Sequence, residues 1–161
     1  MKTQLCALAS GLVLAFSGAA AFAGSTGSTY QNGFNNDAAI TQAYNGNATA
    51  KIVQEGAQNV AKANQDNNWF GTANIDIYQN GYQNFANAQQ SHTLNSDSKI
   101  VQVGALNVAN TKQTWGANQS SDVYQNGYNN TANVTQMGSN LSATAVQVGV
   151  QNLSTITQTG W

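Results

Sequence analysis

The stretch YQNGYNNTANVTQ, residues 124–136, carries five Asn and Gln side chains before its last residue. Closely similar strings occur earlier in the chain, YQNGYQNFANAQQ at 78–90 and YQNGFNNDAAITQ at 30–42. Such a pattern cannot build an ordinary apolar core, because a buried amide group without a hydrogen-bond partner costs about 1–3 kcal/mol. The repetition therefore raises the question of which groups satisfy these amides.

The three strings belong to a longer pattern, Q-x-G-x-x-N-x-[A/S]-x-x-x-Q, which recurs six times at steps of 23, 25, 23, 23 and 22 residues. Its opening Gln, its Gly, its Asn and its closing Gln are, copy by copy, Gln31, Gly33, Asn36, Gln42; Gln54, Gly56, Asn59, Gln65; Gln79, Gly81, Asn84, Gln90; Gln102, Gly104, Asn107, Gln113; Gln125, Gly127, Asn130, Gln136; Gln147, Gly149, Asn152, Gln158. Self-similarity at a fixed period of about 20–50 residues indicates stacked structural repeats.

Each copy is expected to form a strand, a turn, a second strand and a return turn. The G-x-x-N segment marks the first turn, because Gly and Asn both tolerate left-handed backbone angles. Polar clusters such as Gln65 to Asn68 and Asn95 to Asp97 mark the return. Two strands of about six residues and two turns fill one step. The sequence predicts an all-β fold, a β-solenoid of six strand-turn-strand rungs that stacks into a cross-β amyloid fibre.

The period of two along a strand assigns the core face of each rung. The residues two before the opening Gln share its face, and they are Thr29, Ile52, Ile77, Ile100, Val123 and Ala145. On the second strand the Asn, the following Ala or Ser and the closing Gln share a face. Stacked rungs bury this face and set each amide about 4.8 Å from its equivalent in the next rung, where the two can hydrogen-bond. We therefore predict that the repeated Gln and Asn residues are stacking and polymerisation residues, and that the glycines are turn residues.

A second period, two rungs long, lies outside the core face. Rungs one, three and five carry an aromatic residue before the opening Gln and another after the Gly, where the other rungs carry Val or Ala. Three residues before the opening Gln, Lys51, Asp76, Lys99 and Asp122 alternate in sign on successive rungs. Stacked in register, the four would form a ladder of opposite charges, although freely solvated side chains are an equally good interpretation. An even number of rungs would let the alternation continue into a second molecule.

The N-terminal segment is expected to lie outside the repeats. Residues 1–23 combine a basic start at Lys2, an apolar run from Leu5 to Phe16 and an A-x-A site at 21–23, as a secretory signal peptide does. Residues 24–30 form a short lead-in, and 31–161 hold the six repeats, which start at about 25, 48, 73, 96, 119 and 141. The single cysteine, Cys6, falls in the signal peptide, so no disulfide is expected.

Composition excludes several classes of function. Only 7% of residues are charged, against about 25% in typical domains, and the chain lacks Pro and Arg. No basic patch indicates nucleic-acid binding, and no apolar run beyond the first indicates a transmembrane segment. The only histidine, His92, has no supporting catalytic pattern and is expected in a solvated turn, so neither an enzyme, a metal site nor a cofactor is predicted. A monomeric β-solenoid used for binding remains an alternative.

The S/A-x5-Q-x-G-x-x-N-x-A-x3-Q repeat resembles the curlin repeat of curli fibre subunits, complete in Q, G, N and Q from Gln31 to Gln158. The resemblance implies a secreted bacterial protein that assembles into extracellular cross-β fibres for adhesion and biofilm matrix. It also implies a nucleating subunit, an outer-membrane secretion pore and periplasmic factors that prevent early assembly.

The chain departs from the usual curlin pattern in three respects. Only Gly24 to Thr29 could serve as the Gly-rich targeting segment, the repeats number six instead of five, and the leading Ser is kept only as Ser25 and Ser96. The last repeat keeps its four motif residues and has no basic residue, which favours a major subunit over a minor nucleator.

The end rungs should make the contacts between molecules. A solenoid has an unpaired strand edge at each end, and nothing here is typical of a polar capping repeat. Two different ends that meet head to tail build an open filament. The expected contact residues are Gln31, Asn36 and Gln42 at one end and Gln147, Asn152 and Gln158 at the other.

Overall fold

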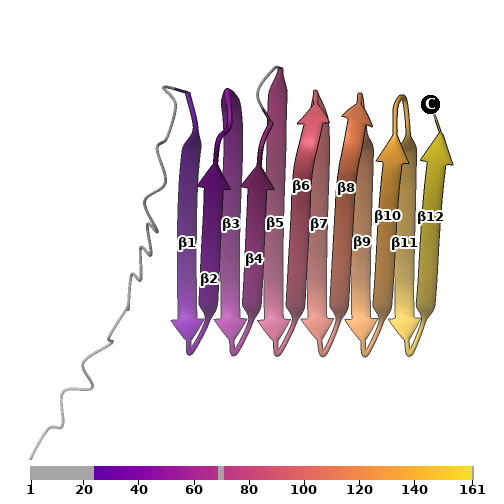
Figure 1. Ribbon diagram of the computed structural model, residues 1–161. Coiled ribbons are helices and arrows are strands. Elements are labelled where there is room, and N and C mark those ends of the chain that lie inside the picture. Colours follow the sequence, from indigo (N-terminus) through magenta and orange to yellow (C-terminus); the bar gives the residue numbers. More distant parts are fainter. Residues whose placement is uncertain (1–23, 69–70, 161) are drawn as a thin grey trace, which may run out of the picture.

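The computed structural model describes residues 24–68 and 71–160, and this part of the chain is built from strands without a helix (Figure 1). The strands are β1 (Thr26–Phe34), β2 (Asp37–Ala43), β3 (Asn47–Ala57), β4 (Val60–Asp66), β5 (Thr72–Tyr82), β6 (Phe85–Leu94), β7 (Ser96–Ala105), β8 (Val108–Ala117), β9 (Ser120–Tyr128), β10 (Thr131–Gly138), β11 (Ser142–Val150) and β12 (Leu153–Gly160). The expected signal peptide, Trp69 and Trp161 lie outside the described residues.

The strands form two six-stranded parallel sheets that face one another. Odd-numbered strands make the first sheet, in the order β1-β3-β5-β7-β9-β11, and even-numbered strands make the second. Each strand pairs with its equivalent in the neighbouring rung, so that Gln31 lies opposite Gln54 and Gln42 opposite Gln65. One odd and one even strand make a rung, and the six rungs follow one another along a single axis (Figure 1). The predicted six-rung β-solenoid is confirmed.

Small and β-branched residues fill the space between the sheets. Ile52, Ile77, Ile100 and Val123 are fully buried on the first sheet, and they belong to the same core cluster as the alanines of the second sheet. The opening and closing glutamines of rungs two to five are also fully buried. The predicted core face is therefore confirmed. Alanine opposite isoleucine keeps the sheets close enough for a glutamine to reach across, which matters for the hydrogen bonds described below.

The first corner, where the two strands of a rung meet, differs from expectation in one respect. The repeat glycines do have positive φ, between 100° and 134°. The second left-handed residue is not the repeat Asn, however, but the residue before it: Asn35, Gln58, Gln83, Leu106, Asn129 and Gln151, with φ of 53–59°. Such angles are uncommon for a residue like Leu106. Stacking compensates for them, because from rung two onward each of these residues donates its backbone N–H to a carbonyl of the preceding rung at 2.9–3.0 Å.

The second corner, where one rung passes to the next, is less regular. The strands run 7–11 residues, longer than the expected six. The odd-numbered strands continue through the repeat glycine of the first corner, and β6 and β8 continue through a residue of positive φ near the second corner. His92 and Trp115 are two such residues, with φ of 55° and 50°. They lie within β6 and β8, so the prediction that His92 lies in a solvated turn is wrong. Their rings stack with centroids 4.1 Å apart and an interplanar angle of 12°.

Candidate functional site

The opening glutamines form a continuous ladder through the first sheet. The Nε2 of Gln31 donates to the Oε1 of Gln54, and the same bond repeats through Gln79, Gln102, Gln125 and Gln147 at 2.7–2.8 Å. From rung two onward, each Nε2 also donates to a backbone carbonyl of the second sheet, as Gln102 does to Phe85 at 2.9 Å. The ladder therefore ties rung to rung and sheet to sheet.

The closing glutamines form a second ladder with the same direction. Gln42 donates to Gln65, and the bonds continue through Gln90, Gln113, Gln136 and Gln158 at 2.8–3.0 Å. Each Nε2 again reaches a carbonyl of the opposite sheet, such as that of Asp97 from Gln113 at 2.8 Å. A backbone carbonyl can only accept, so this second bond fixes which end of the amide is the nitrogen. Both ladders accordingly point their donors toward the C-terminal end of the molecule.

The repeat asparagines form a third ladder at the first corner, and it runs the other way. The backbone N and Nδ2 of Asn59 both donate to the Oδ1 of Asn36, and Asn84, Asn107, Asn130 and Asn152 repeat the arrangement at 2.9–3.2 Å. Because a backbone N–H can only donate, the orientation of each amide is again fixed. The Asn ladder points its acceptors toward the C-terminal end.

The repeat glycines stack closely beside the Asn ladder. A Cβ added to Gly33, Gly56, Gly81, Gly104 or Gly127 would lie 1.8–2.1 Å from the glycine carbonyl oxygen of the next rung. That carbonyl accepts from the Nδ2 of the preceding Asn, for example from Asn84 to Gly104 at 2.9 Å. At Gly149 the nearest atom to such a Cβ is the Nδ2 of Asn152, at 3.5 Å. The last glycine thus has the conformation of the others beside an open space, where the carbonyl of a further rung would fit.

The end rungs expose what interior rungs cover. β1 and β2 are outermost at one end of the two sheets, and β11 and β12 at the other. Gln31, Gln42 and Gln158 are half-buried, whereas their interior equivalents are fully buried. The outward residues of the last rung are also exposed, with Val146 at 65% and Val150 at 63%. Val53 and Val101 are the interior valines in the column of Val146. They are half-buried because each lies between the Tyr residues of its two neighbouring rungs.

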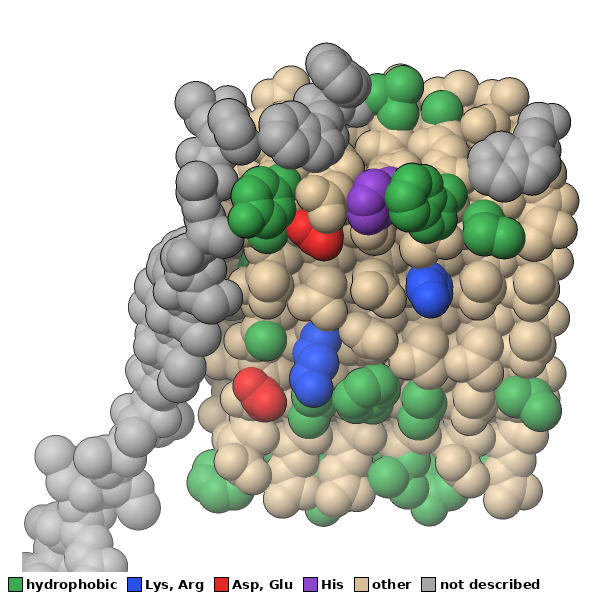
Figure 2. All heavy atoms as spheres, viewed as in Figure 1, with side chains coloured by type: hydrophobic (Ala, Val, Ile, Leu, Met, Phe, Trp, Pro, Cys, Tyr) green, Lys and Arg blue, Asp and Glu red, His purple; other side chains and the backbone are tan. Residues whose placement is uncertain are grey.

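The outer surfaces carry few charges. Figure 2 shows the outer face of the second sheet as a largely uncharged polar surface with scattered Lys and Asp side chains. On the first sheet, Lys51, Asp76, Lys99 and Asp122 do stack in register, between Ser28 and Thr144 of the end rungs. Asp97 lies beside this column. Partial desolvation raises the pKa of its carboxyl, Asp76 and Asp122 raise it further, and Lys99 opposes them.

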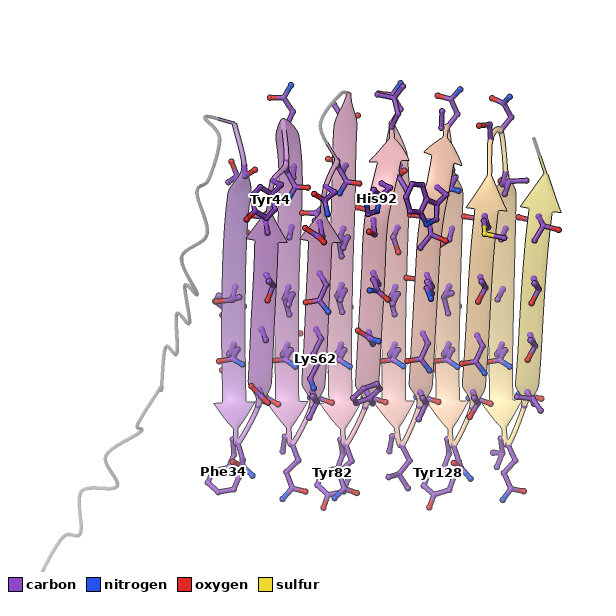
Figure 3. The ribbon with its side chains drawn as sticks, viewed as in Figure 1. Phe34, Tyr44, Lys62, Tyr82, His92 and Tyr128 are labelled. Carbon is purple, nitrogen blue, oxygen red and sulfur yellow. The ribbon has the colours of Figure 1, made fainter. Side chains whose placement is uncertain are left out.

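Aromatic side chains line the two edges of the stack. Phe34, Tyr82 and Tyr128 project from the first corners of rungs one, three and five, away from the sheets (Figure 3). Ala57, Ala105 and Val150 occupy the same column in the other rungs. The large and small side chains therefore alternate along the stack as the sequence indicated. Tyr44 and His92 lie at the opposite edge (Figure 3).

One amide pair was missed in the sequence. Asn45 and Asn68 are buried at the second corner, where the backbone N of Asn68 donates to the Oδ1 of Asn45 at 3.1 Å and Asn45 donates to the carbonyl of Gln65 at 2.9 Å. Both follow a closing Gln by three residues, so a Q-x-x-N spacing at the return turn could have revealed them. The pair stops at Thr93, which lies opposite Gly116 of rung four, so the second corner has no ladder of full length.

The described residues offer neither a metal site nor a membrane span. No group of three or more His, Cys, Asp or Glu side chains in them is placed to hold a metal ion. Within the same residues there is no helix long and apolar enough to cross a membrane. The repeated chemistry of this part of the chain is the set of three amide ladders.

These ladders define a class: a parallel β-solenoid held together by hydrogen-bonded amide stacks, with unpaired strands at both ends. The family model of the curlin associated repeat matches residues 127–160, which include the end of β9 and all of β10, β11 and β12. The chain therefore carries the curlin repeat, and the resemblance drawn from its sequence is confirmed. The repeat indicates a curli-type fibre subunit, a structural protein rather than an enzyme. A comparison with curated proteins gave no match.

Proposed function

We propose that this protein is the major, polymerising subunit of an extracellular amyloid fibre, and that it grows head to tail through its end rungs. The observation that carries the proposal is the direction of the three ladders. At the C-terminal end, Gln147 and Gln158 present donors and Asn152 presents an acceptor. At the N-terminal end, Gln31 and Gln42 present acceptors and Asn36 presents donors. The two ends are complementary at all three positions.

Only one orientation satisfies this complementarity. If rung one of the next subunit stacked on rung six, Gln147 would donate to Gln31, Gln158 to Gln42, and Asn152 would accept from Asn36. Two N-terminal ends would instead set acceptor against acceptor at both glutamines, and a buried amide left unpaired costs about 1–3 kcal/mol. Backbone groups follow the same rule, since the N–H of Asn35 would reach the carbonyl of Val150 as Gln151 reaches Tyr128 at 2.9 Å.

Side-chain packing supports the same junction. Tyr30 and Phe34 of the next subunit would lie over Val146 and Val150, so a large residue again neighbours a small one. The exposed valines would then resemble the half-buried Val53 and Val101. The carbonyl of Gly33 would enter the open space beside Gly149. Stacking thus buries apolar surface and completes all three ladders at once, which is the condition for stable cross-β growth.

The wider setting is carried over from the curlin repeat. We propose that the chain is secreted and forms a pilus-like fibre at the bacterial surface, for adhesion and biofilm matrix. Its partners would be further copies of itself, a nucleator subunit, an outer-membrane secretion pore and periplasmic anti-assembly factors. The six regular ladder positions favour the major subunit over the nucleator, because the last rung keeps the full set of Gln147, Gly149, Asn152 and Gln158.

Alanine substitutions along one ladder test the role of the ends. Gln31→Ala and Gln147→Ala should slow seeded elongation more than Gln79→Ala, because only the end glutamines face the junction between subunits. Elongation rate would be measured at equal monomer and seed concentrations. Each rate would be compared with the denaturant midpoint of the finished fibre, so that the loss of one ladder position in every subunit is separated from the loss at the junction. Equal slowing by all three substitutions would contradict control of growth by the ends.

A further inference from the structure

The outer face of the first sheet carries two neighbouring columns of side chains that continue through all six rungs. The apolar column alternates tyrosine with valine: Tyr30, Val53, Tyr78, Val101, Tyr124 and Val146. The charge column lies two residues earlier on each strand: Ser28, Lys51, Asp76, Lys99, Asp122 and Thr144. Every interior member of the apolar column is only half-buried. Head-to-tail growth would continue this row along the filament, and extended apolar surfaces mark interaction sites.

The apolar column is complementary to itself under one rotation. A two-fold axis along the strands, between rungs three and four, sets the face against a second copy whose filament direction is reversed. Rung one then faces rung six, rung two faces rung five, and rung three faces rung four. Because the column alternates every rung and the number of rungs is even, each tyrosine meets a valine. The facing pairs are Tyr30 with Val146, Tyr124 with Val53 and Tyr78 with Val101.

The same rotation brings opposite charges together. Lys51 would face Asp122 of the second copy, and Asp76 would face Lys99. Each kind of pair would occur twice, because a two-fold axis repeats every contact. A shift of one rung would instead set Lys51 against Lys99 or Asp76 against Asp122, and like charges across an interface are unfavourable. The charge column therefore selects the register in which the tyrosines meet the valines.

The other two carboxylates on this face would meet amide groups. Glu55 would face Asn126, and Asp97 would face Asn74, and an Asn side chain can donate to a carboxylate. Glu55 already accepts from the Oη of Tyr78 at 2.9 Å. Among the outward residues that the structure describes on the odd-numbered strands, no charge would face another of its own sign.

Other arrangements lack this fit. A two-fold axis along the filament, through the apolar column, would keep two filaments parallel and set Tyr78 against its own copy, with Lys99 against Val103. On the second sheet, the reversed arrangement would set the carboxylate of Asp37 against Leu153. A charge buried against an apolar group without a partner is costly. The complementarity thus belongs to the first sheet and to the reversed direction.

We propose that two filaments pair face to face through the outer face of the first sheet, in opposite directions, with the apolar and charge columns as the contact. The proposal rests on the head-to-tail growth proposed above, because a filament presents the face without interruption. Six rungs and four outward columns give each subunit a face of about 700 Å², close to the about 800 Å² that each partner buries in a standard interface. The contact repeats at every subunit, so pairing strengthens as the filaments lengthen.

Two valines of rung four supply matched variants. Val101 lies in the apolar column and Val108 lies on the outer face of the second sheet, and both are half-buried beside an aromatic residue of rung three. Val101→Lys places an unpaired charge in the proposed contact, and Val108→Lys places the same charge outside it. Val53→Lys repeats the first change at rung two, in case one variant assembles poorly.

Mass per unit length of the grown filaments, measured by scanning transmission electron microscopy, tests the pairing. Wild type and Val108→Lys should give twice the mass per length of one solenoid stack, and Val101→Lys and Val53→Lys should give half the wild-type value. Single wild-type filaments would overturn the proposal and leave the face to a different kind of partner. Pairs that persist in both apolar-column variants, or that separate only with Val108→Lys, would overturn it as well. A protein that forms no filaments would contradict the proposed function too, whereas single filaments leave that function intact.

Growth at the two ends tests the direction of pairing. A pair related by this two-fold axis has identical ends, so wild-type pairs should elongate at equal rates from both ends in two-colour fluorescence microscopy. Single Val101→Lys filaments, whose ends carry Gln31 and Gln147 respectively, supply the comparison. Unequal growth at the two ends of wild-type pairs would overturn the reversed arrangement.

Discussion

Individual side chains explain why so polar a sequence has a stable interior. Each interior ladder glutamine, such as Gln102, donates twice and accepts once inside the stack, so its burial leaves no donor unpaired. A neutral hydrogen bond contributes only about 0.5–1.5 kcal/mol net, but an orphaned buried amide costs about 1–3 kcal/mol. Because an unmade buried bond costs more than a made bond contributes, the ladders mainly select the strand register. A slip of one position would leave both glutamines of a rung without their hydrogen-bond partners.

The raised pKa of the Asp97 carboxyl predicts that the stability of the fold depends on pH. Its pKa is raised in the folded chain, so the folded state binds the proton more tightly than the unfolded state does. The resulting penalty is fully present above the folded pKa and is relieved as the pH falls through that value toward the ordinary 3.8. Asp97→Asn should therefore stabilise the fold at neutral pH and reduce the gain in stability on acidification.

Denaturant midpoints between neutral pH and about pH 4 would show this effect, with Asp37→Asn on the second sheet as the control. An Asp97→Asn variant that loses stability at neutral pH, or that gains as much as the wild type on acidification, would contradict the assignment.

At the scale of the strand, the column of alternating charges on the first sheet, Lys51, Asp76, Lys99 and Asp122, favours the observed strand register. Lys51, Asp76 and Lys99 lie on adjacent strands in register, and exposed pairs of this kind contribute about 0–1 kcal/mol each. Asp76→Lys would place three lysines in succession and turn two attractive contacts into repulsive ones. We expect a loss of about 1–2 kcal/mol at low salt, most of which disappears at about 1 M salt because charges at this distance are then screened.

The salt dependence distinguishes this cause from lost packing. Asp122→Lys is a useful second variant, because Asp122 has Lys99 on one side and Thr144 on the other and should cost about half as much. A penalty for Asp76→Lys that is independent of salt would indicate lost packing instead, and the absence of any penalty would show that the column is simply a set of solvated side chains.

The strands also show what the sequence could and could not reveal. Six copies of Q-x-G-x-x-N with alternating Ile, Ala and Gln determine the rung, the core face and the parallel register, because a period of two and a period of 23 agree at each position. Both corners escaped part of this reasoning. At the second corner His92 and Trp115 lie in strands rather than in turns. At the first corner the left-handed residue is Leu106 rather than Asn107, because its backbone bond to the neighbouring rung outweighs the conformational preference of a single residue. Such bonds are invisible in one repeat.

For the candidate site, the pattern predicted which amides stack but not which way they point. Sequence alone placed Gln31 and Gln147 at opposite ends. The direction of donation required backbone carbonyls such as those of Phe85 and Thr131, which come from the opposite sheet. No local signal carries that information.

For the whole molecule, the two-rung alternation makes the number of rungs matter. With six rungs, Tyr30 and Phe34 of one subunit follow Val146 and Val150 of another. Deleting residues 139–161 leaves five rungs, so that Tyr124 and Tyr128 would face Tyr30 and Phe34 at each junction. In the intact chain, Val or Ala lies between the aromatic residues of these two columns. At the five-rung junction the aromatic residues would instead lie on adjacent strands and crowd one another, so seeded elongation should slow.

Removal of two rungs, residues 117–161, is the matched control, because it shortens the chain further but restores the alternation with Val101 and Ala105 at the end. The four-rung chain should therefore elongate wild-type seeds faster than the five-rung chain does. If growth rate simply falls with each rung removed, the alternation has no part in docking.

The central claim is that this solenoid completes its ladders by joining other copies. The most direct measurement is far-UV circular dichroism of the freshly desalted chain without residues 1–23, followed over time with and without preformed fibre seeds. The account predicts a lag followed by a rising β signal, and seeds should shorten the lag because they present a finished rung to copy. A β signal that is complete at once, independent of concentration and insensitive to seeds, would contradict it and indicate a self-contained solenoid.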